Sequence, residues 1–576
     1  MSELPKIHAL QLEQTVTFAD RETTSRAALL QWPASEPSAL APTGVPSTSF
    51  QRDYIDIVPT NWAAISISLS EAGSDLYVTR YQASQTPFIL RLPMARQSSQ
   101  LMDDEDVFDF AAGKTELHEI IELSDFSTHS QRDMSVKGAK TEWWAEREAL
   151  DNRLKELLVN IENIWLGGFR GIFSQHTRWP DLLSRFQKSF QNILNKHLPS
   201  RKGNRGQQKR LNLDSRVLEL FVGLGDASNE DVDLDEPIMD LLYFVVDILQ
   251  FSGERNAYDE IDFDSIAIET LEALRAYHSA AATDADTSHT RQHTILILDK
   301  NLHAFPWESL PCLQNDSITR LPSMGALRER ILTARAPSSS SSNTNELPSA
   351  GHHIPFTSSS SHKRIGTTIL NPSGDLQHTQ STLEPHIQTL APDSWTHIAG
   401  RAPTEPEFET ALKDSKLVLY FGHGSGAQYI RSRTIHPQRQ PPEQHPTPTA
   451  LLYGCASAAL TTHGAFEPSG MLAAYVAAGA PAVLGMLWDV TDRDCDRFAV
   501  RVGEVWGLWP GDGGGDAKKK GKQRQMEIEK PMGAKTPGRK TPGRRKRGRL
   551  GIERWSAVVG RERWGGGGGS VSTRRL

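Results

Sequence analysis

Residues 416–430 read KLVLYFGHGSGAQYI, and this run is the first of three that decide the fold of the chain. The second is TALLYGCASAAL at 449–460, and the third is PAVLGMLWDVTDRDCDRF at 481–498. Each run contains a short continuous apolar segment, which is typical of a strand buried in a parallel sheet. The first strand leads to His423, the second to Cys455 and the third to a group of aspartates.

The residues before these runs alternate between the two kinds of element. Strands are predicted at 294–302, 395–400 and 416–424, a strand that leads into a turn at 366–374, and helices at 324–336, 379–390 and 403–414. This alternation predicts an α/β fold with a mostly parallel sheet flanked by helices. Reactive groups in such sheets gather at the carboxyl ends of the strands. We therefore expect His423 and Cys455 to lie at one edge of the sheet.

The pattern also divides the chain into regions. Five are predicted: a flexible segment at 1–55, a strand-rich region at 56–139, a helical region at 140–282, an α/β domain at 283–507 and a disordered basic, Gly-rich tail at 508–576. Serine tracts predict a disordered insertion at 336–361 inside the α/β domain. In the strand-rich region, 61–70 and 74–82 are predicted to pair, with a third strand at 87–94.

The helical region has its clearest periodicity at 143–175, where leucine and isoleucine recur every three or four residues. Three tryptophans, Trp143, Trp144 and Trp165, lie on or beside this stretch. We interpret them as anchors of the hydrophobic core rather than as a ligand platform.

Composition restricts the class of protein. The 576 residues exceed one compact core, so two or three domains are expected. The net charge of −7 argues against attraction of the whole protein to nucleic acid. Three cysteines are too few for a disulfide framework, which favours a reducing compartment. We find neither a signal-peptide pattern nor an apolar run of about 18 residues, so no membrane association is expected.

His423 and Cys455 together suggest nucleophilic catalysis. A thiol becomes a strong nucleophile when a neighbouring base takes its proton. Glycines next to these residues, including Gly424 and Gly454, allow tight turns and close substrate approach, and backbone N–H groups near Gly424 and Cys455 suit an oxyanion. The segment after Cys455, residues 457–480, is predicted to enter a helix, and the start of that helix would favour a thiolate. The alternative is that the cysteine is a core residue and the histidine is structural.

The third run ends in four aspartates: Asp489, Asp492, Asp494 and Asp496. Carboxylates beside a cysteine site predict a pocket for a cationic side chain, and arginine fits best because its planar fork pairs with a carboxylate at two points. A helix N-cap and an exposed turn are the other interpretation for some of them. Cys495 lies among these carboxylates, which raise the pKa of a thiol, so we expect it to be a poor nucleophile. A serine hydrolase is not indicated, because no G-x-S-x-G motif accompanies the HGSG sequence.

Taken together, several segments resemble the C-terminal protease region of separase. They are YFGHGSGAQYI, LLYGCAS, AAGAPAVLGMLWDVTDRDCDRF, ILILDKNLHAFPWESLPCL, TILNPSGDL and LLVNIENIWLGGFRGIFSQ, and the likeness covers about residues 60–507. It implies a caspase-like cysteine endopeptidase that cleaves the kleisin subunit of cohesin after arginine in an E-x-x-R site, and so releases sister chromatids at anaphase. Securin is the expected inhibitor. The resemblance assigns the general base to His423, the nucleophile to Cys455 and the arginine-binding acid to Asp496, with Asp489 as second choice.

The resemblance also implies a nuclear and cytoplasmic protein without metal or organic cofactor. It departs from the family in two places: the long helical-repeat region that precedes the protease is not found, and the likeness stops after Trp506. A catalytically inactive homologue that serves as a binding scaffold is therefore a second hypothesis, and another caspase-like processing protease is a third. The basic tail has the composition of a nuclear-localisation or nucleic-acid-binding arm, but we expect a disordered tail without nucleic-acid binding.

Overall fold

The computed structural model describes residues 47–94, 108–129, 135–176, 179–202, 211–229, 232–283, 292–314, 316–335, 364–435, 447–464 and 466–510. The predicted insertion at 336–361 lies outside these ranges, as do residues 1–46 and 511–576 of the predicted terminal segments. Contacts divide the chain into two units, one formed by 1–350 with 460–468 and the other by 351–459 with 469–576. None of the helices in the described ranges combines the length and the apolar character that crossing a bilayer requires.

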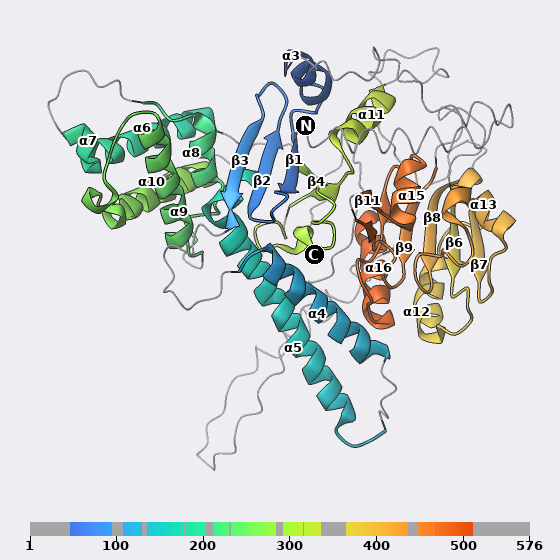
Figure 1. Ribbon diagram of the computed structural model, residues 1–576. Helices are drawn as coiled ribbons and strands as arrows, with labels where there is room; N and C mark the ends of the chain where they lie inside the picture. Colours follow the sequence, from blue (N-terminus) through green and yellow to red (C-terminus); the bar gives the residue numbers. More distant parts are fainter. Residues whose placement is uncertain are drawn as a thin grey trace, which may run out of the picture. The chain divides into compact units, whose positions relative to one another are not determined.

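A mixed five-stranded sheet organises the first unit, in the order β3-β2-β1-β4-β5 (Figure 1). Its strands are β1 (Trp62–Leu69), β2 (Asp75–Tyr81), β3 (Phe88–Pro93), β4 (His293–Leu298) and β5 (Ile318–Arg320). The first three strands pair antiparallel as predicted, whereas β4 is parallel to both β1 and β5. The predicted domain start at residue 283 is therefore misplaced: 293–320 completes the first sheet, and the second unit begins at 351.

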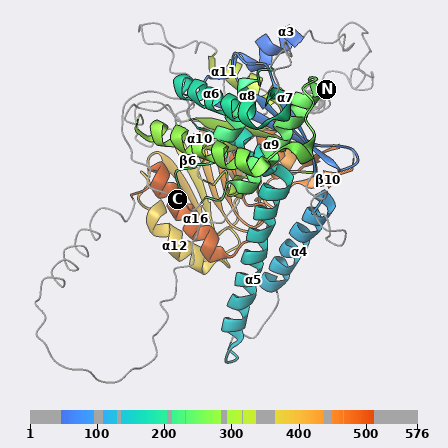
Figure 2. The ribbon, with the colours of Figure 1, turned by 90° about the vertical axis from the view of Figure 1, so that its left-hand side faces the viewer.

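Helices make up most of the remainder of the first unit. They are α3 (Ser47–Phe50), α4 (Phe110–His129), α5 (Ala139–Asn160), α6 (Pro180–His197), α7 (Pro199–Lys202), α8 (Ser215–Val222), α9 (Asp235–Phe251), α10 (Phe263–Thr283) and α11 (Met324–Arg335). Both views show α4 and α5 side by side (Figure 2). The prediction of a flexible segment up to residue 55 is wrong at its end, because α3 and a π-helical turn, Gln51–Ile55, bring Ile55 into the core with no exposed surface.

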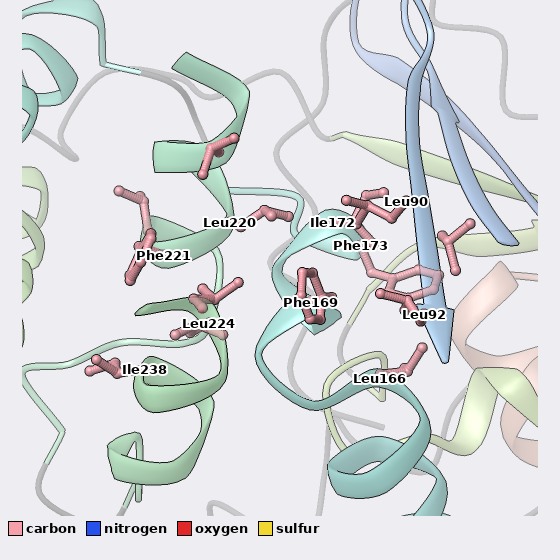
Figure 3. Close-up of a cluster of buried hydrophobic side chains, with 14 of the residues drawn as sticks. Leu90, Leu92, Leu166, Phe169, Ile172, Phe173, Leu220, Phe221, Leu224 and Ile238 are labelled. Carbon is pink, nitrogen blue, oxygen red and sulfur yellow. The ribbon is translucent and has the colours of Figure 1, made fainter. Parts of the chain in front are cut away.

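The strongly periodic stretch at 143–175 is helical as far as Phe173, but not as one α-helix. After α5 the chain continues as a wider π-helix, Ile161–Leu166, and then as a tighter 3₁₀ helix, Gly167–Phe173. Figure 3 shows the 3₁₀ segment between β3 and the helices, with Phe173 beside Leu92. Glycine is required at position 171, where a Cβ atom would lie 2.1 Å from the carbonyl oxygen of Leu220.

The three tryptophans of this region do not share one role. Trp165 is fully buried and stacks on Phe108, which confirms it as a core anchor. Trp143 is half-buried, and its indole donates a hydrogen bond to the Ser127 carbonyl oxygen. Trp144 is 56% exposed, so its assignment to the core is wrong.

The second unit contains a fully parallel sheet in the order β12-β9-β8-β6-β7. Its strands are β6 (Arg364–Leu370), β7 (Trp395–Ala399), β8 (Ser415–Phe421), β9 (Thr449–Tyr453) and β12 (Val483–Leu484). The helices are α12 (Gln377–Ile387), α13 (Glu405–Asp414), α14 (Ser432–Ile435), α15 (Met471–Ala477) and α16 (Asp492–Trp506). Between β9 and α15 the chain forms a two-stranded ribbon, β10 (Thr461–His463) and β11 (Phe466–Ser469), most of which belongs to the first unit.

Helices cover both faces of this sheet, because side chains on a strand alternate between faces. On β8, Leu419 and Phe421 join a hydrophobic cluster with residues of α12 and α16, whereas Val418 and Tyr420 join a cluster with residues of α13 and α15. The result is the predicted α/β architecture of a parallel sheet flanked by helices. Strands buried on both faces explain why the 416–421 sequence is continuously apolar.

Helix α16 ends at Trp506, the predicted limit of the likeness, and the residues that follow cap the helix and pack against it. Gly507 adopts a left-handed conformation with φ of 77°, and the Leu508 N–H donates back to the Gly503 carbonyl at 2.8 Å. Trp509 then folds onto the helix and is 4% exposed, and its indole donates to the Val500 carbonyl at 3.1 Å. The packed core of the second unit therefore extends at least to Trp509.

Candidate active site

The strand order of the second unit has a topological switch point at the carboxyl end of β6. From β6 the chain passes to β7 on one side of it and then to β8 on the other side. Connections that leave in opposite directions open a crevice outside the strand ends, where ligands of α/β proteins bind. Asp375 follows β6 at this point and His423 follows β8, and Cys455 follows the next strand, β9.

The register between β8 and β9 brings His423 and Cys455 to the same edge, as predicted. Phe421 and Tyr453 are directly paired, and the two candidate residues each lie two positions further along their strands. Neighbouring strands run about 4.8 Å apart. A Cβ atom on Gly454 would lie 2.2 Å from the Gly424 carbonyl oxygen, so the backbone that carries His423 passes against the residue before Cys455.

Hydrogen bonds fix the turn that carries His423. The Tyr420 hydroxyl donates to the His423 carbonyl oxygen at 2.7 Å, and the Gln428 side-chain amide donates to the same oxygen at 3.1 Å. Gly424 has φ of 61°, in the left-handed region that favours glycine. The imidazole itself remains half-exposed at the mouth of the site. The predicted role of Gly424 as a turn residue is thus confirmed, whereas its role in an oxyanion site stays a prediction.

Asp375 is a site residue that the sequence did not reveal. Its Oδ2 lies 2.9 Å from Nε2 of His423, and this hydrogen bond holds the pKa of the Asp375 carboxyl below its usual value. An ionised carboxylate only accepts hydrogen bonds, so Nε2 of His423 carries the proton. In the neutral ring, Nδ1 is then the nitrogen with a free lone pair, and this atom can act as the base.

The loop from β6 to Asp375 has its own support. Asn371 is fully buried with φ of 48°, and its side-chain oxygen accepts the Leu376 N–H at 2.9 Å. Asparagine tolerates this left-handed conformation better than most residues. The only signal in the sequence is therefore an NPSGD turn directly after a predicted strand, and turn formation explains those residues equally well.

Cys455 begins a strained turn after β9. The thiol is half-buried and donates to the carbonyl oxygen of Val490 at 3.3 Å. Ala456 has φ of 49°, a left-handed conformation that costs a non-glycine residue on the order of 1 kcal/mol. Its N–H donates to the Trp488 carbonyl at 3.0 Å, which holds the turn against the segment after β12.

The segment 457–480 contains a helix as predicted, but the start of this helix does not lie next to Cys455 in the sequence. The turn is followed by β10 and β11, and α15 begins only at Met471. The partial positive charge of a helix N-terminus falls off within the first turn of the helix, so α15 does not stabilise a Cys455 thiolate through its position in the sequence. Stabilisation of a Cys455 thiolate would have to come from other groups than this helix.

The four aspartates of the third run separate into two groups. Asp492 and Asp494 occupy the first turn of α16, where the Thr491 hydroxyl accepts the Asp494 N–H, so the helix-cap interpretation is correct for this turn. Asp489 is half-buried and precedes Val490, the residue that accepts from the Cys455 thiol. Asp496 is 3% exposed, and burial raises the pKa of its carboxyl.

Cys495 is a buried thiol in the same hydrophobic cluster against which Cys455 packs. Burial, followed by the charge of Asp496, raises its pKa well above the usual range. A thiol with a raised pKa is rarely ionised at neutral pH. The prediction that Cys495 is a poor nucleophile is consistent with this environment, although burial contributes more than the carboxylates.

His423 and Cys455 lie within a match to a known protein family. The family model for the protease domain of separin matches residues 71–495, which include β2, both candidate catalytic residues and the start of α16. The chain belongs to the separin family. The resemblance to separase is thereby confirmed.

Individual separins share much of this sequence. Separin of Emericella nidulans is 45% identical over 509 residues, which cover 88% of this chain and 23% of the relative. Separin of Schizosaccharomyces pombe is 37% identical over 461 residues, covering 80% of this chain and 23% of the relative. The chain thus spans about a quarter of the length of the curated separins it matches.

Solved separase structures share its fold. Two crystal structures of the Saccharomyces cerevisiae separase–securin complex match with TM-scores of 0.65 and 0.66 and sequence identities of 31% and 30%. They cover 79% and 81% of this chain, and 28% and 29% of the yeast chain. The match confirms the predicted caspase-like α/β fold, and the separin family makes this a protease-type domain.

Proposed function

We propose that the chain is a cysteine endopeptidase that cleaves after arginine, with Cys455 as nucleophile and His423 as general base. One observation carries the proposal: His423 and Cys455 follow directly paired ends of adjacent parallel strands, beside the topological switch point at β6. The hydrogen bond from His423 Nε2 to Asp375 supports it, because it presents the lone pair of Nδ1 for proton transfer.

The reaction follows from these groups. Nδ1 of His423 takes the proton of the Cys455 thiol, and the thiolate attacks the carbonyl carbon of the substrate arginine. Backbone N–H groups at Gly424 and Cys455 are the proposed donors to the tetrahedral oxyanion, with Gly454 allowing the two turns to approach. The imidazolium then returns its proton to the leaving amine, a thioester forms, and water releases the acid and the thiol.

Arginine specificity is assigned to an acid of the third run. Asp496 is the first candidate and Asp489 the second. A buried carboxylate such as Asp496 pairs well with a guanidinium, because two parallel hydrogen bonds replace the water that the carboxylate has lost. Asp489 is supported by its position next to Val490, which contacts the nucleophile.

The biological substrate and partners are inferred from the family. We infer that the substrate is the kleisin subunit of cohesin, cut at E-x-x-R sites in mitosis and meiosis, and that a securin-like protein inhibits the reaction. The yeast structures that match this fold are separase–securin complexes, which supports the inhibitor. Nuclear and cytoplasmic localisation is part of the same proposal.

A peptide assay tests the chemistry. The full chain and its Cys455→Ala variant are incubated with a fluorogenic peptide that ends in Glu-x-x-Arg, and with matched peptides in which alanine replaces either the arginine or the glutamate. Cleavage that requires both Cys455 and arginine is the expected result. Equal signals from the two proteins would contradict the protease assignment and favour a scaffold.

The same assay distinguishes the proposed protease from the third hypothesis, another caspase-like processing protease. A different caspase-like processing protease would cleave the arginine peptides without regard to the glutamate three residues earlier. A kleisin fragment with its E-x-x-R site intact or mutated extends the test to a protein substrate. Cleavage elsewhere in the fragment would reject the proposed specificity while leaving the cysteine mechanism intact.

A further inference from the structure

Asp496, the first candidate for arginine recognition, is already covered by another side chain. Nδ1 of His378, near the start of α12, lies 3.3 Å from its Oδ2. The two side chains differ greatly in exposure, at 53% for His378 and 4% for Asp496. The exposed histidine thus lies on a buried carboxylate. A ligand that pairs with this carboxylate must either bind beside the His378 imidazole or displace it.

The surroundings of Asp496 provide little permanent compensation for its charge. After burial, the groups that act on its pKa are His378 and Thr379, whose hydrogen bonds lower it, and Asp492, whose charge raises it. In the described part of the chain, that set includes no lysine or arginine. A buried carboxylate is costly unless a charged partner with good geometry accompanies it. A guanidinium satisfies this requirement better than an imidazole, because it donates two parallel hydrogen bonds.

His378 is free to leave without disturbing the core. Its other recorded hydrogen-bond partner is the Thr382 hydroxyl at 3.4 Å, one turn further along the same exposed helix face. A polar contact in which one side chain is half-exposed is weak, since water competes for the imidazole. Rotation of the side chain into solvent would expose Asp496 and leave no cavity among apolar residues.

We propose that His378 gates the arginine-binding carboxylate: its imidazole covers Asp496 until the guanidinium of the substrate replaces it. The proposal rests on the function proposed above and makes His378 a specificity-determining residue outside the chemical step. Substrate binding then includes the displacement of His378. The apparent affinity for arginine is lower than the intrinsic affinity by the fraction of molecules in which Asp496 is uncovered.

Steady-state kinetics with the arginine peptide test the gate. His378→Ala should lower KM by about threefold or more, as expected when a competing state is removed, with kcat unchanged. His378→Arg should raise KM, because its own guanidinium would occupy Asp496. His386→Ala is the matched control: this histidine lies on the same helix but contacts the Trp509 ring. An unchanged or raised KM in His378→Ala would overturn the gate and make the imidazole a fixed support.

A second measurement needs no catalysis and uses His378 itself. In the Cys455→Ala protein, modification of each histidine by diethylpyrocarbonate is followed by peptide mass spectrometry, with and without N-acetylarginine amide. The ligand should accelerate modification of His378 but not of His386. In an Asp496→Asn, Cys455→Ala protein, His378 should be modified rapidly without ligand, and N-acetylarginine amide should not change the rate of its modification.

The two experiments distinguish the failure of each proposal. If no arginine peptide is cleaved, yet N-acetylarginine amide exposes His378, the gate stands and the protease assignment fails. If peptides are cleaved with dependence on Cys455, yet neither the reactivity of His378 nor KM responds as expected, the gate is wrong and the protease assignment stands.

Discussion

Nε2 of His423 lies 2.9 Å from Oδ2 of Asp375, although 48 positions separate the two residues in the chain. The loops after β6 and β8 carry them, and these strands are neighbours in the sheet. The carboxylate therefore selects the ring tautomer with the proton on Nε2 and the lone pair on Nδ1. Both side chains are more than half exposed, so the contact adds little to stability and serves mainly to position the ring.

Replacement of Asp375 should thus reduce turnover rather than folding. We expect Asp375→Ala to lower kcat by about 10- to 100-fold with KM nearly unchanged, a part of the 10²–10⁴-fold that general bases contribute. Asp375→Asn should lower kcat less, because its amide oxygen can still accept the hydrogen bond from Nε2 of His423. Asp393→Asn, an exposed carboxylate elsewhere in the same unit, should leave kcat unaltered. Full turnover in Asp375→Ala would remove Asp375 from the mechanism.

The structure explains why the sequence revealed His423 and Cys455 but not Asp375. The first two follow long apolar runs, and consecutive parallel strands bring their ends together. Asp375 follows a Pro- and Gly-containing turn, where an aspartate is common for local reasons. Its link to His423 depends on β8 pairing with β6 rather than with β7, and no local pattern specifies that choice.

Long-range pairing also determined the other differences. The apolar run at 294–298 was predicted as a parallel strand, and β4 is one. It pairs with β1, however, so it belongs to the first sheet. The boundary between the two units therefore lies later in the chain than the predicted domain start at residue 283. The buried Asp496 and Asp494, whose N–H is capped by Thr491, differ in the face of α16 on which they lie, and the run of alternating acids does not show that face.

Two buried tyrosines offer a matched test of the His423 turn. Tyr420 and Tyr475 are both fully buried in the same cluster, but only Tyr420 donates to the His423 carbonyl. Within the described part of the chain, the Tyr475 hydroxyl has no hydrogen-bond partner. We expect Tyr420→Phe to lose about 1 kcal/mol of unfolding free energy and some turnover, and Tyr475→Phe to be neutral or stabilising. Urea denaturation measures both, and equal effects would contradict the role of Tyr420.

Gly454 and Gly424 are expected to respond differently to alanine. A Cβ atom on Gly454 would meet backbone oxygens of Gly422 and Gly424 at 2.3 and 2.2 Å, and these atoms cannot move without separating the ends of β8 and β9. We expect Gly454→Ala to abolish activity and to lower the unfolding free energy by about 1–3 kcal/mol. Gly424→Ala has open space around its Cβ atom, so its left-handed φ should cost about 1–2 kcal/mol with activity partly retained. An active Gly454→Ala protein would show that the two turns are not in close contact.

His278 provides a pH test of stability in the first unit. The ring is 6% exposed, its Nδ1 accepts the Ala227 N–H at 3.3 Å, and its Nε2–H donates to the Val222 carbonyl at 3.1 Å. These bonds require the neutral ring, and burial lowers the pKa of His278. The unfolded chain therefore binds a proton more readily than the folded protein. The stability contributed by the neutral ring is present above about pH 6.5 and is lost as the pH falls towards the lowered pKa.

The contribution of His278 has to be separated from that of Asp316 in the same unit. Burial raises the pKa of Asp316 to about 6, so its contribution has the opposite sign and is lost as the pH rises from about 4 to 6. The informative quantity is the difference in unfolding free energy between the wild type and His278→Gln, in which the effect of Asp316 cancels. This difference should shrink below pH 6.5 with a slope of up to about 1.4 kcal/mol per pH unit. His118→Gln, an exposed histidine on α4, should keep the wild-type slope, and a pH-independent difference for His278→Gln would show that the buried ring does not titrate on unfolding.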